Sequence, residues 1–183
     1  VRNSAQTILA SIDLLSQSHL PKGQRELIAA ALAAGQSLRR LLDRSLAFSR
    51  LASGSFRPHP VPCDVGQLCA RALEAIRPEA LRRGLSLQLD RTPDPAPVVA
   101  LDADGLRQIV DNLLGNALKF TDVGGIEVRL QLSPALSPRE LLLDVIDSGI
   151  GIAPAQLALL FRPFQQSEEG QRRGGTGLGL TIA

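Results

Sequence analysis

The sequence predicts an α+β fold in two parts, a pair of helices followed by a sandwich of helices and a sheet. Three observations support this prediction. Apolar residues recur at helical spacing over about the first fifty positions, alternating runs typical of strands appear only later, and a Pro-rich stretch separates the two patterns. The 183 residues, 44% of them apolar, suffice for one domain or two small domains with cores of their own.

The first part, residues 1–54, is predicted to be an antiparallel helical hairpin. Its first helix, over residues 1–18, carries apolar residues at alternating steps of three and four: Ala5, Ile8, Ile12 and Leu15. Pro21 and Gly23 break that pattern, and a second helix with heptad-like spacing follows from about Gln24 to Leu51. A lone hairpin cannot bury both apolar stripes. We therefore expect either a four-helix bundle with a second copy or packing against the rest of the chain.

Residues 52–62 have the Gly, Ser and Pro content of a linker, and their prolines favour extended backbone. We therefore expect a domain boundary near residue 54, with the second part spanning residues 55–183.

The second part mixes helices and strands. Asp64 is a predicted N-cap for a helix from Val65 to about Arg83. Period-two alternation and short apolar runs predict strands, the last of them more buried, at Leu85–Leu89, Val98–Leu101, Ile126–Leu132 and Glu140–Asp147. A hairpin of the last two strands, with helices on one face, would form the α+β sandwich.

The stretch Asp104–Thr121 is the helix around which the second part is organised. One broad face is apolar and should meet the core: Leu106, Ile109, Val110, Leu113, Leu114 and Ala117. Beside it, Asn112, Asn116 and Lys119 stand at i, i+4 and i+7, although the chain has only three Asn and two Lys. Amide oxygens can ligate Mg²⁺ and a lysine suits a phosphate, whereas the alternative is an ordinary solvated face.

Glycine motifs follow this helix. Asp147-Ser148-Gly149-Ile150-Gly151 places a carboxylate at a strand end, where it could accept a hydrogen bond from an amine such as that of adenine, or simply cap a tight turn. Residues 165–173 are polar and aperiodic, as a mobile lid would be. Gly174-Gly175-Thr176-Gly177-Leu178-Gly179-Leu180 then offers backbone N–H groups before a helix, which is an anion cradle but not a Walker A loop.

Composition excludes several classes of protein. The net charge of +2 is scattered and aromatic residues make up only 3%, so nothing favours nucleic acid as a partner. Cys63 and Cys69 form neither a disulfide framework nor a zinc pattern, which fits a reducing compartment. No apolar run approaches eighteen residues and no signal peptide is present. We expect a soluble piece of a longer protein whose other parts could cross a membrane.

Together, and in this order, the motifs resemble the N, G1, F and G2 boxes of sensor histidine kinases. The matching runs are Gln-Ile-x-x-Asn-Leu-Leu-x-Asn-Ala-x-Lys-Phe-Thr, the Asp147 motif, Leu160–Phe164 and the loop after Gly174, in the style of hybrid sensor kinases. Residues 34–54 look like the second helix of that family's dimerisation domain, and Arg2 onward looks like the tail of its phospho-acceptor box. The resemblance implies a GHKL (Bergerat) sandwich with a mixed, mostly antiparallel sheet, shared with gyrase and the Hsp90 chaperones. It also implies a homodimer through residues 1–54.

The resemblance implies ATP and Mg²⁺ as cofactors. Catalytic roles would fall to Asn112 and Lys119, and Asn3 matches a position used in dephosphorylating the partner. The implied ATP-binding residues are Asn112, Asn116, Lys119, Phe120, Asp147, Gly149, Gly151, Arg172, Arg173, Gly175, Thr176, Gly177, Leu178 and Gly179, with Asn116 and Asn112 as the Mg²⁺ ligands. Related ATPases carry a Glu at the position of Asn112, and an amide cannot act as a base, which favours phosphate transfer over hydrolysis.

The implied activity is transfer of the γ-phosphate to a histidine of the dimerisation helix, and then to an aspartate of a response-regulator receiver domain. The acceptor position falls three residues before Arg2, outside this sequence, and neither His19 nor His59 fits it. The implied location is the cytoplasm, as the cytoplasmic portion of an inner-membrane sensor. Two alternatives stay open: a degenerate kinase that acts as a dimeric signalling scaffold, and an ATPase of the same fold.

Overall fold

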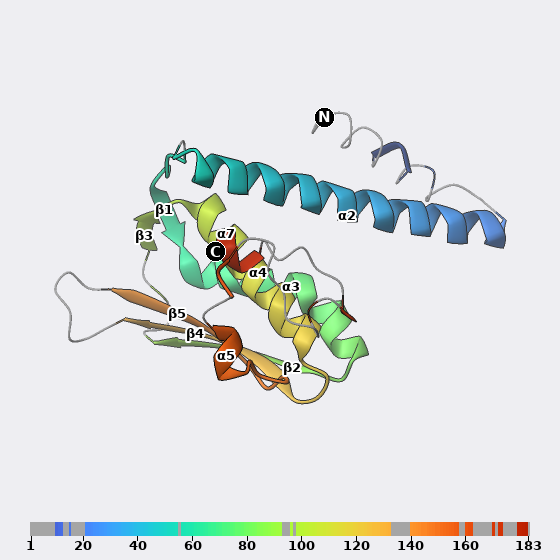
Figure 1. Cartoon of the computed structure of the whole chain (residues 1–183). Helices are drawn as coiled ribbons and strands as arrows, with labels where there is room; N and C mark the ends of the chain where they lie inside the picture. The colour runs from blue at the N-terminus through green and yellow to red at the C-terminus, as the bar shows by residue number, and fades with distance from the viewer. Residues whose placement is uncertain are drawn as a thin grey trace. The chain divides into compact units, whose positions relative to one another are not determined.

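The computed structural model describes residues 10–12, 15, 21–54, 56–92, 96, 98–132, 140–157, 160–162, 170, 172–173 and 179–182. The chain divides into two compact units, Val1–Ser55 and Phe56–Ala183, whose elements are drawn in Figure 1. The boundary predicted near residue 54 falls beside this division.

The first unit is described mainly through one long helix, α2 (Lys22–Ala52). It begins directly after Pro21, whose carbonyl accepts hydrogen bonds from the N–H groups of Gln24 and Arg25. Gly23 therefore lies inside the first turn of α2, which begins two residues before the predicted start at about Gln24. Of the first predicted helix, only residues 10–12 and 15 are described, and they are helical. The antiparallel hairpin therefore stays a prediction.

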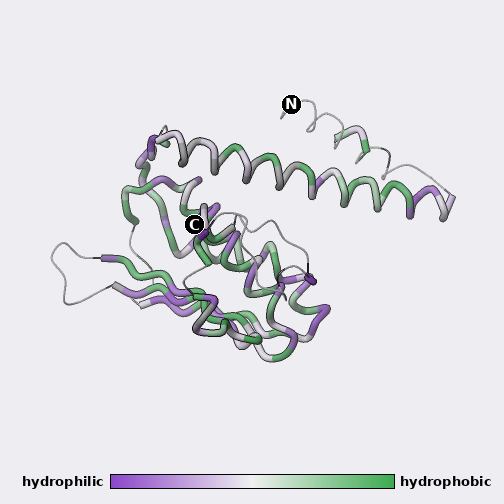
Figure 2. Tube along the Cα trace, in the orientation of Figure 1, coloured by the Kyte–Doolittle hydropathy of each residue, from purple (hydrophilic) through white to green (hydrophobic). Residues whose placement is uncertain are grey.

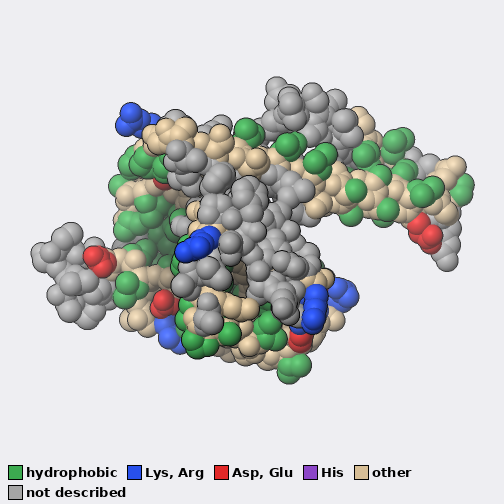
Figure 3. Space-filling view, viewed as in Figure 1, with side chains coloured by type: hydrophobic (Ala, Val, Ile, Leu, Met, Phe, Trp, Pro, Cys, Tyr) green, Lys and Arg blue, Asp and Glu red, His purple; other side chains and the backbone are tan. Residues whose placement is uncertain are grey.

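Several leucines of α2 are open to solvent among the side chains that the structure describes. Three of its leucines are 72%, 55% and 47% exposed, namely Leu27, Leu38 and Leu46. Figure 3 shows hydrophobic side chains along this helix. An exposed stripe of this kind fits the expected pairing with a second copy, which stays a prediction.

The second unit is built on a three-stranded sheet with the order β2–β4–β5. β2 (Ser86–Thr92) runs parallel to β4 (Gly125–Leu132), and β4 is antiparallel to β5 (Leu141–Asp147). The predicted hairpin of the last two strands and the mixed character of the sheet are therefore confirmed. Because β2 and β4 are parallel, a long crossover must connect them, and it contains β3 and the central helix α4 (Ala103–Phe120).

A separate two-stranded ribbon pairs β1 (Val61–Asp64) with β3 (Val98–Leu101) in antiparallel register. The prediction missed β1, because Pro62 lies in it and the surrounding Pro-rich stretch was interpreted as linker. Proline lacks an N–H donor, but an edge strand needs only one row of donors. The ribbon also means that β3 lies outside the main sheet.

The helices α3 (Val65–Arg82) and α4 cover one face of the main sheet, as Figure 1 shows. The predicted N-cap of α3 is confirmed, because Asp64 Oδ1 accepts a hydrogen bond of 2.8 Å from the N–H of Gln67. Figure 2 shows hydrophobic and hydrophilic positions alternating along these elements. The largest fully buried core side chains come from both layers: Val65, Cys69, Val110, Leu114, Ile126, Val128 and Leu130.

The last strand is less buried than predicted. Leu142 and Ile146 of β5 are 45% and 39% exposed, because alternate residues point away from the helix layer and the described residues cover only one sheet face. Two short helices, α5 (Pro154–Leu157) and α7 (Gly179–Ile182), complete the described part. No helix of the described ranges is long and apolar enough to cross a bilayer.

Candidate functional site

The central helix α4 carries the candidate site residues beside its apolar core face and at its C-terminal end. Asp102 caps its N-terminus, with Oδ1 accepting from the N–H of Gly105 at 2.8 Å, and Val110 and Leu114 anchor its apolar face in the core. On its polar stripe, Asn112 is buried, at 6% exposure, and Asn116 is half-buried. The helix and its stripe are therefore present as predicted, with Asn112 deeper than a solvated face would allow.

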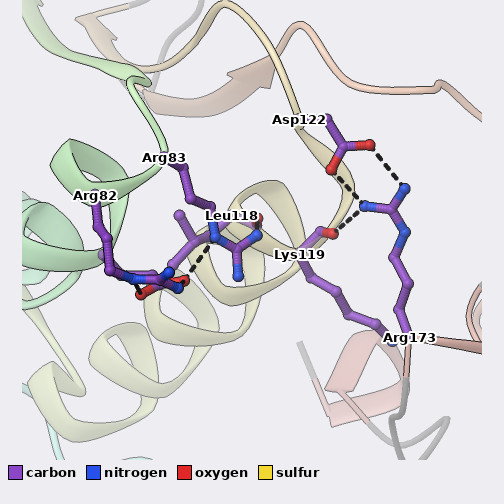
Figure 4. A network of polar contacts seen from close by, with 7 residues as sticks. Arg82, Arg83, Leu118, Lys119, Asp122 and Arg173 are labelled. Carbon is purple, nitrogen blue, oxygen red and sulfur yellow. Dashed lines mark hydrogen bonds and ion pairs between the residues drawn. The ribbon is translucent and has the colours of Figure 1, made fainter.

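The C-terminal end of α4 is a meeting point for three segments that are distant in sequence. The guanidinium of Arg83 donates to the carbonyl of Leu118 at 3.0 Å, and that of Arg173 donates to the carbonyl of Lys119 at 2.8 Å. Figure 4 shows both arginines reaching this helix end. Cations at a helix C-terminus satisfy free carbonyls and interact favourably with the helix dipole.

The Asp147 turn is joined to the same helix end. The N–H of Ile150 donates to the carbonyl of Phe120 at 3.3 Å. A Cβ added to Gly149 would lie 2.5 Å from that carbonyl oxygen, so the glycine is required by close packing on α4. The sequence had suggested close approach to a flat ligand ring as its reason. Gly151 has a positive φ of 68° and open space around it, which suits a glycine for its backbone conformation.

Asp147 lies on the helix-facing side of the sheet. It pairs with Ile126, and paired residues of antiparallel strands point to the same face. Its Oδ1 accepts a hydrogen bond of 2.8 Å from the N–H of Gly149, and its side chain is exposed. The carboxylate is thus held by backbone while remaining accessible to a ligand.

Lys119 lies beside these groups and is half-buried. Its Nζ donates to the carbonyl of Gly170 at 3.0 Å and lies 4.7 Å from the ring centroid of Phe120. Arg173 forms a two-pronged ion pair with Asp122, with both contacts at 2.8–2.9 Å. The hydrogen bond from Arg173 and the charge of Arg83 keep the pKa of Asp122 below its ordinary value.

An open cavity of about 480 Å³ lies against this end of α4. Its lining residues are Arg83, Gly115, Leu118, Lys119 and Arg173. Three of the lining residues are cations, of which Arg83 pairs with Glu79 and Arg173 with Asp122. The lining includes two predicted site residues, Lys119 and Arg173, but not the two asparagines or Asp147.

The donors on α4 fit a metal carried by a nucleotide better than a metal held by protein alone. Among the described residues, no group of three or more His, Cys, Asp or Glu side chains could hold a metal ion. Mg²⁺ commonly keeps several waters and takes one or two protein oxygens together with substrate phosphates. The amide oxygen of Asn116 on an accessible helix face suits that arrangement.

Several predicted site residues lie outside the described part: Asn3, Gly175, Thr176, Gly177 and Leu178. Gly179 opens α7, which contacts α4, and Arg172 is exposed. The structure therefore brings together Lys119, Phe120 and Arg173 with the Asp147 turn and leaves the glycine-rich loop a prediction.

Sequence reasoning missed the partners of the helix end. Arg83 was predicted only as the end of α3, and Asp122 was not singled out. Their pairing depends on the fold bringing the ends of α3 and α4 together. The basic run of Arg82 and Arg83 just before a strand was the available signal.

Comparison with known families supports ATP binding by this domain. The family described as histidine kinase-, DNA gyrase B-, and HSP90-like ATPase matches residues 101–183.

Relatives narrow this class further. The chain is 36% identical over its whole length to the autoinducer 2 sensor kinase/phosphatase LuxQ of Vibrio cholerae, and 33% identical to the sensor histidine kinase AruS of Pseudomonas aeruginosa. It spans 22% and 19% of the length of these two proteins. Together with the family match, these relatives support a sensor histidine kinase catalytic domain in this chain.

Solved structures agree with this assignment. Full-length ShkA, crystallised in complex with AMPPNP, is 30% identical with a TM-score of 0.78, over 99% of this chain and 37% of that one. The histidine kinase AdeS of Acinetobacter baumannii, at 21% identity, shares the fold with a TM-score of 0.66 over 98% of this chain and 81% of that one.

Proposed function

We propose that this chain is the catalytic core of a two-component sensor kinase that binds Mg·ATP in its second unit and phosphorylates a histidine. One observation carries the proposal. The hydrogen bond between Ile150 and Phe120 joins the Asp147 turn to the end of α4 that bears Lys119. A carboxylate that can bind the adenine ring and a cation that can bind a phosphate therefore lie at the same helix end.

Different residues of the site bind the adenine base, the Mg²⁺ ion and the phosphates of the nucleotide. Asp147 accepts the hydrogen bond of the adenine amine, Gly149 and Gly151 shape the turn around the base, and Phe120 flanks the nucleotide. Asn116, with Asn112 helping, holds Mg²⁺, and Lys119 contacts the phosphates. The remaining proposed ligands lie on the phosphate side: Arg172, Arg173, Gly175, Thr176, Gly177, Leu178 and Gly179.

Catalysis in this proposal is mainly positioning and charge neutralisation. Bound Mg²⁺ supplies positive charge that offsets the charge of the transferring phosphoryl group. Lys119 adds a second cation at the phosphates, and its half-buried position strengthens that interaction. Asn112 cannot take a proton from water at neutral pH, so the site favours transfer to another nucleophile over hydrolysis.

The phosphoryl group passes to a histidine on the first helix of a dimer formed through residues 1–54, and then to an aspartate of a receiver domain. Neither His19 nor His59 is the acceptor in this proposal. His59 lies in the extended segment before β1, where its backbone N–H donates to Asp102 Oδ2 at 3.2 Å. Asn3 assists dephosphorylation of the receiver. We place the domain on the cytoplasmic side of an inner-membrane sensor.

The test of the nucleotide site is Asn116→Ala, measured by calorimetry of Mg·ATP binding. Loss of the proposed metal ligand should weaken binding by about 100-fold or more. Without the Asn116 ligand, Mg²⁺ is held less firmly against the phosphates, and losing that charge interaction costs several kcal/mol. Asp111→Ala is the matched control, since Asp111 is an exposed residue of α4 that pairs with Arg107. It should change the affinity less than about twofold. Unchanged affinity in Asn116→Ala would overturn the assignment of α4 as the helix that binds Mg·ATP.

The test of the acceptor uses the same 183-residue chain incubated with ATP labelled at the γ-phosphate. We expect no acid-labile phosphate on this chain, because neither of its histidines is the proposed acceptor. Label on His19 or His59, located by peptide mapping, would refute that placement. Histidine-to-Gln variants at these two positions provide the control.

A further inference from the structure

We propose that Ser148 is a positioning residue for base recognition, because its hydroxyl fastens the Asp147 turn to the turn between α4 and β4. This inference rests on the proposed function, since it takes Asp147 as the residue that binds adenine. Ser148 does not contact the base in this proposal. It fixes the place of the carboxylate relative to the helix that carries the phosphate-binding residues.

The hydroxyl of Ser148 makes two good hydrogen bonds to the turn that precedes β4. Its Oγ donates to the carbonyl of Val123 at 3.0 Å and accepts from the N–H of Gly125 at 2.9 Å. The backbone N–H of Ser148 adds a third bond, of 3.2 Å, to the carbonyl of Gly125. One short side chain therefore ties the end of β5 to both sides of this turn.

The turn is shaped to admit that side chain. Gly124 has a φ of 101°, which an L residue rarely adopts, and a Cβ at this position would collide with Ser148 Oγ. Both the backbone conformation and the space therefore require glycine here. The close approach of hydroxyl and turn is a specific feature of the fold and not a chance surface contact.

A second serine contacts the same turn from the opposite strand. Ser86, at the start of β2, donates its N–H to the carbonyl of Gly124 at 2.9 Å, and its Oγ lies 3.4 Å from the same oxygen. Its hydroxyl bond is long, and the backbone bond remains if the hydroxyl is removed. Ser86 has no bond to the Asp147 turn among the described residues, which makes it a matched control.

Ser148 lies in sequence between the residues of two hydrogen bonds. One holds the Asp147 carboxylate, and the other joins the turn to the end of α4. On one side, Asp147 Oδ1 accepts from the N–H of Gly149, and on the other, Ile150 donates to the carbonyl of Phe120. Asp147 Oδ2 accepts no hydrogen bond from the described residues, so this oxygen is the one open to a ligand amine. Releasing Ser148 would let the turn shift and would change the position of that oxygen relative to the end of α4.

The experiment compares the affinities of ATP and ITP for the 183-residue chain. ITP carries a carbonyl where adenine carries its amine, so it cannot use the hydrogen bond to Asp147. Ser148→Ala should lose about fivefold to tenfold in ATP affinity and less than about twofold in ITP affinity. Ser148→Thr keeps the hydroxyl and should restore ATP binding. Ser86→Ala should leave both affinities within about twofold of the parent chain.

Three outcomes would overturn the proposal. Equal losses for ATP and ITP in Ser148→Ala, with a lower melting temperature, would show a purely structural role. Unchanged ATP affinity in that variant, with a large loss in Asp147→Ala, would overturn the role of Ser148 alone. Unchanged ATP affinity in Asp147→Ala would overturn the assignment of the base-binding residue itself, and the Ser148 proposal with it.

Discussion

The two ends of α4 satisfy their free backbone groups in different ways. At the N-terminus, Asp102 supplies most of what is needed from close by, since it accepts from Gly105 and Leu106. At the C-terminus, the carbonyls of Leu118 and Lys119 accept from arginines 35 and 54 positions away. Every helix leaves such groups at both ends. The difference is that one end is closed locally and the other is closed by the tertiary structure.

This difference explains where the candidate site lies. The N–H groups of the first turn of α4 are satisfied from within the helix, and the one bond to a distant segment, from the backbone N–H of His59, goes to the Asp102 carboxylate and not to the helix backbone. An end whose last carbonyls bind distant segments brings those segments together. At Phe120 the segment is the Asp147 turn, and at Lys119 it is the stretch that carries Arg173.

Among the variants that test the difference between the two ends of α4, Gly149→Ala should have the largest effect. It should push the Asp147 turn away from the C-terminal end of α4. The added Cβ would lie 2.5 Å from the Phe120 carbonyl oxygen, and a backbone atom cannot move aside cheaply. We expect a loss of about 2–3 kcal/mol in the free energy of unfolding, together with weaker ATP binding. Urea denaturation measures the first and calorimetry the second. Full stability in this variant would mean that the turn does not need its contact with α4.

Gly115→Ala is the matched control on the same helix. No atom lies within 4 Å of a Cβ at Gly115, so the change should cost nothing in packing. Alanine restricts the unfolded chain more than glycine does and should raise the free energy of unfolding by about 0.5–1 kcal/mol. Urea denaturation of the two alanine variants side by side would show opposite signs. Equal destabilisation would remove the distinction between the two glycines.

The smallest expected effect is a difference in how the pKa values of Asp102 and Asp122, at the two ends of α4, respond to salt. The pKa of Asp102 is lowered by hydrogen bonds from the N–H groups of Gly105 and His59, whereas the pKa of Asp122 is lowered by Arg173 and the charge of Arg83. A lowered pKa stabilises the fold above the ordinary carboxyl range, and that stability is lost as the pH falls through the lowered value.

Salt should separate the two causes. At about 1 M salt, screening should return the pKa of Asp122 toward its ordinary value and leave that of Asp102 nearly unchanged, because exposed ion pairs are screened more than hydrogen bonds to backbone. Carboxyl carbon NMR titrations at low and high salt measure both groups in one sample. Equal salt responses would contradict the proposed difference in cause.

The elements of the second unit were predictable where their signal is local. The apolar spacing predicts α4 to within a residue or so, and the alternation in Ile126–Leu132 predicts β4. The strand β1 was missed because its only evidence is its pairing with β3, which no local pattern contains. The burial of β5 was overestimated because an apolar run does not say how many sheet faces are covered.

The candidate site also has one part with a local sequence signal and one part that depends on long-range pairing. The stripe of Asn112, Asn116 and Lys119 could be predicted because helical spacing fixes it. The bonds of Ser148 to the turn before β4 could not be, because they depend on the antiparallel register of β4 and β5. Long-range register is what local patterns cannot supply, and this site depends on it at the C-terminal end of α4.

The hydrophobic core of the second unit has a consequence for how such proteins are assembled over evolution. Among the described residues, every member of the core cluster lies between Cys63 and Val145, and those from Ser53 to Pro60 are exposed. A gene fusion within that short segment therefore divides no contact of the core cluster that the described residues form. The ATP-binding half can be inherited as a module and joined to a new helix, and a new input signal, without any change to its interior.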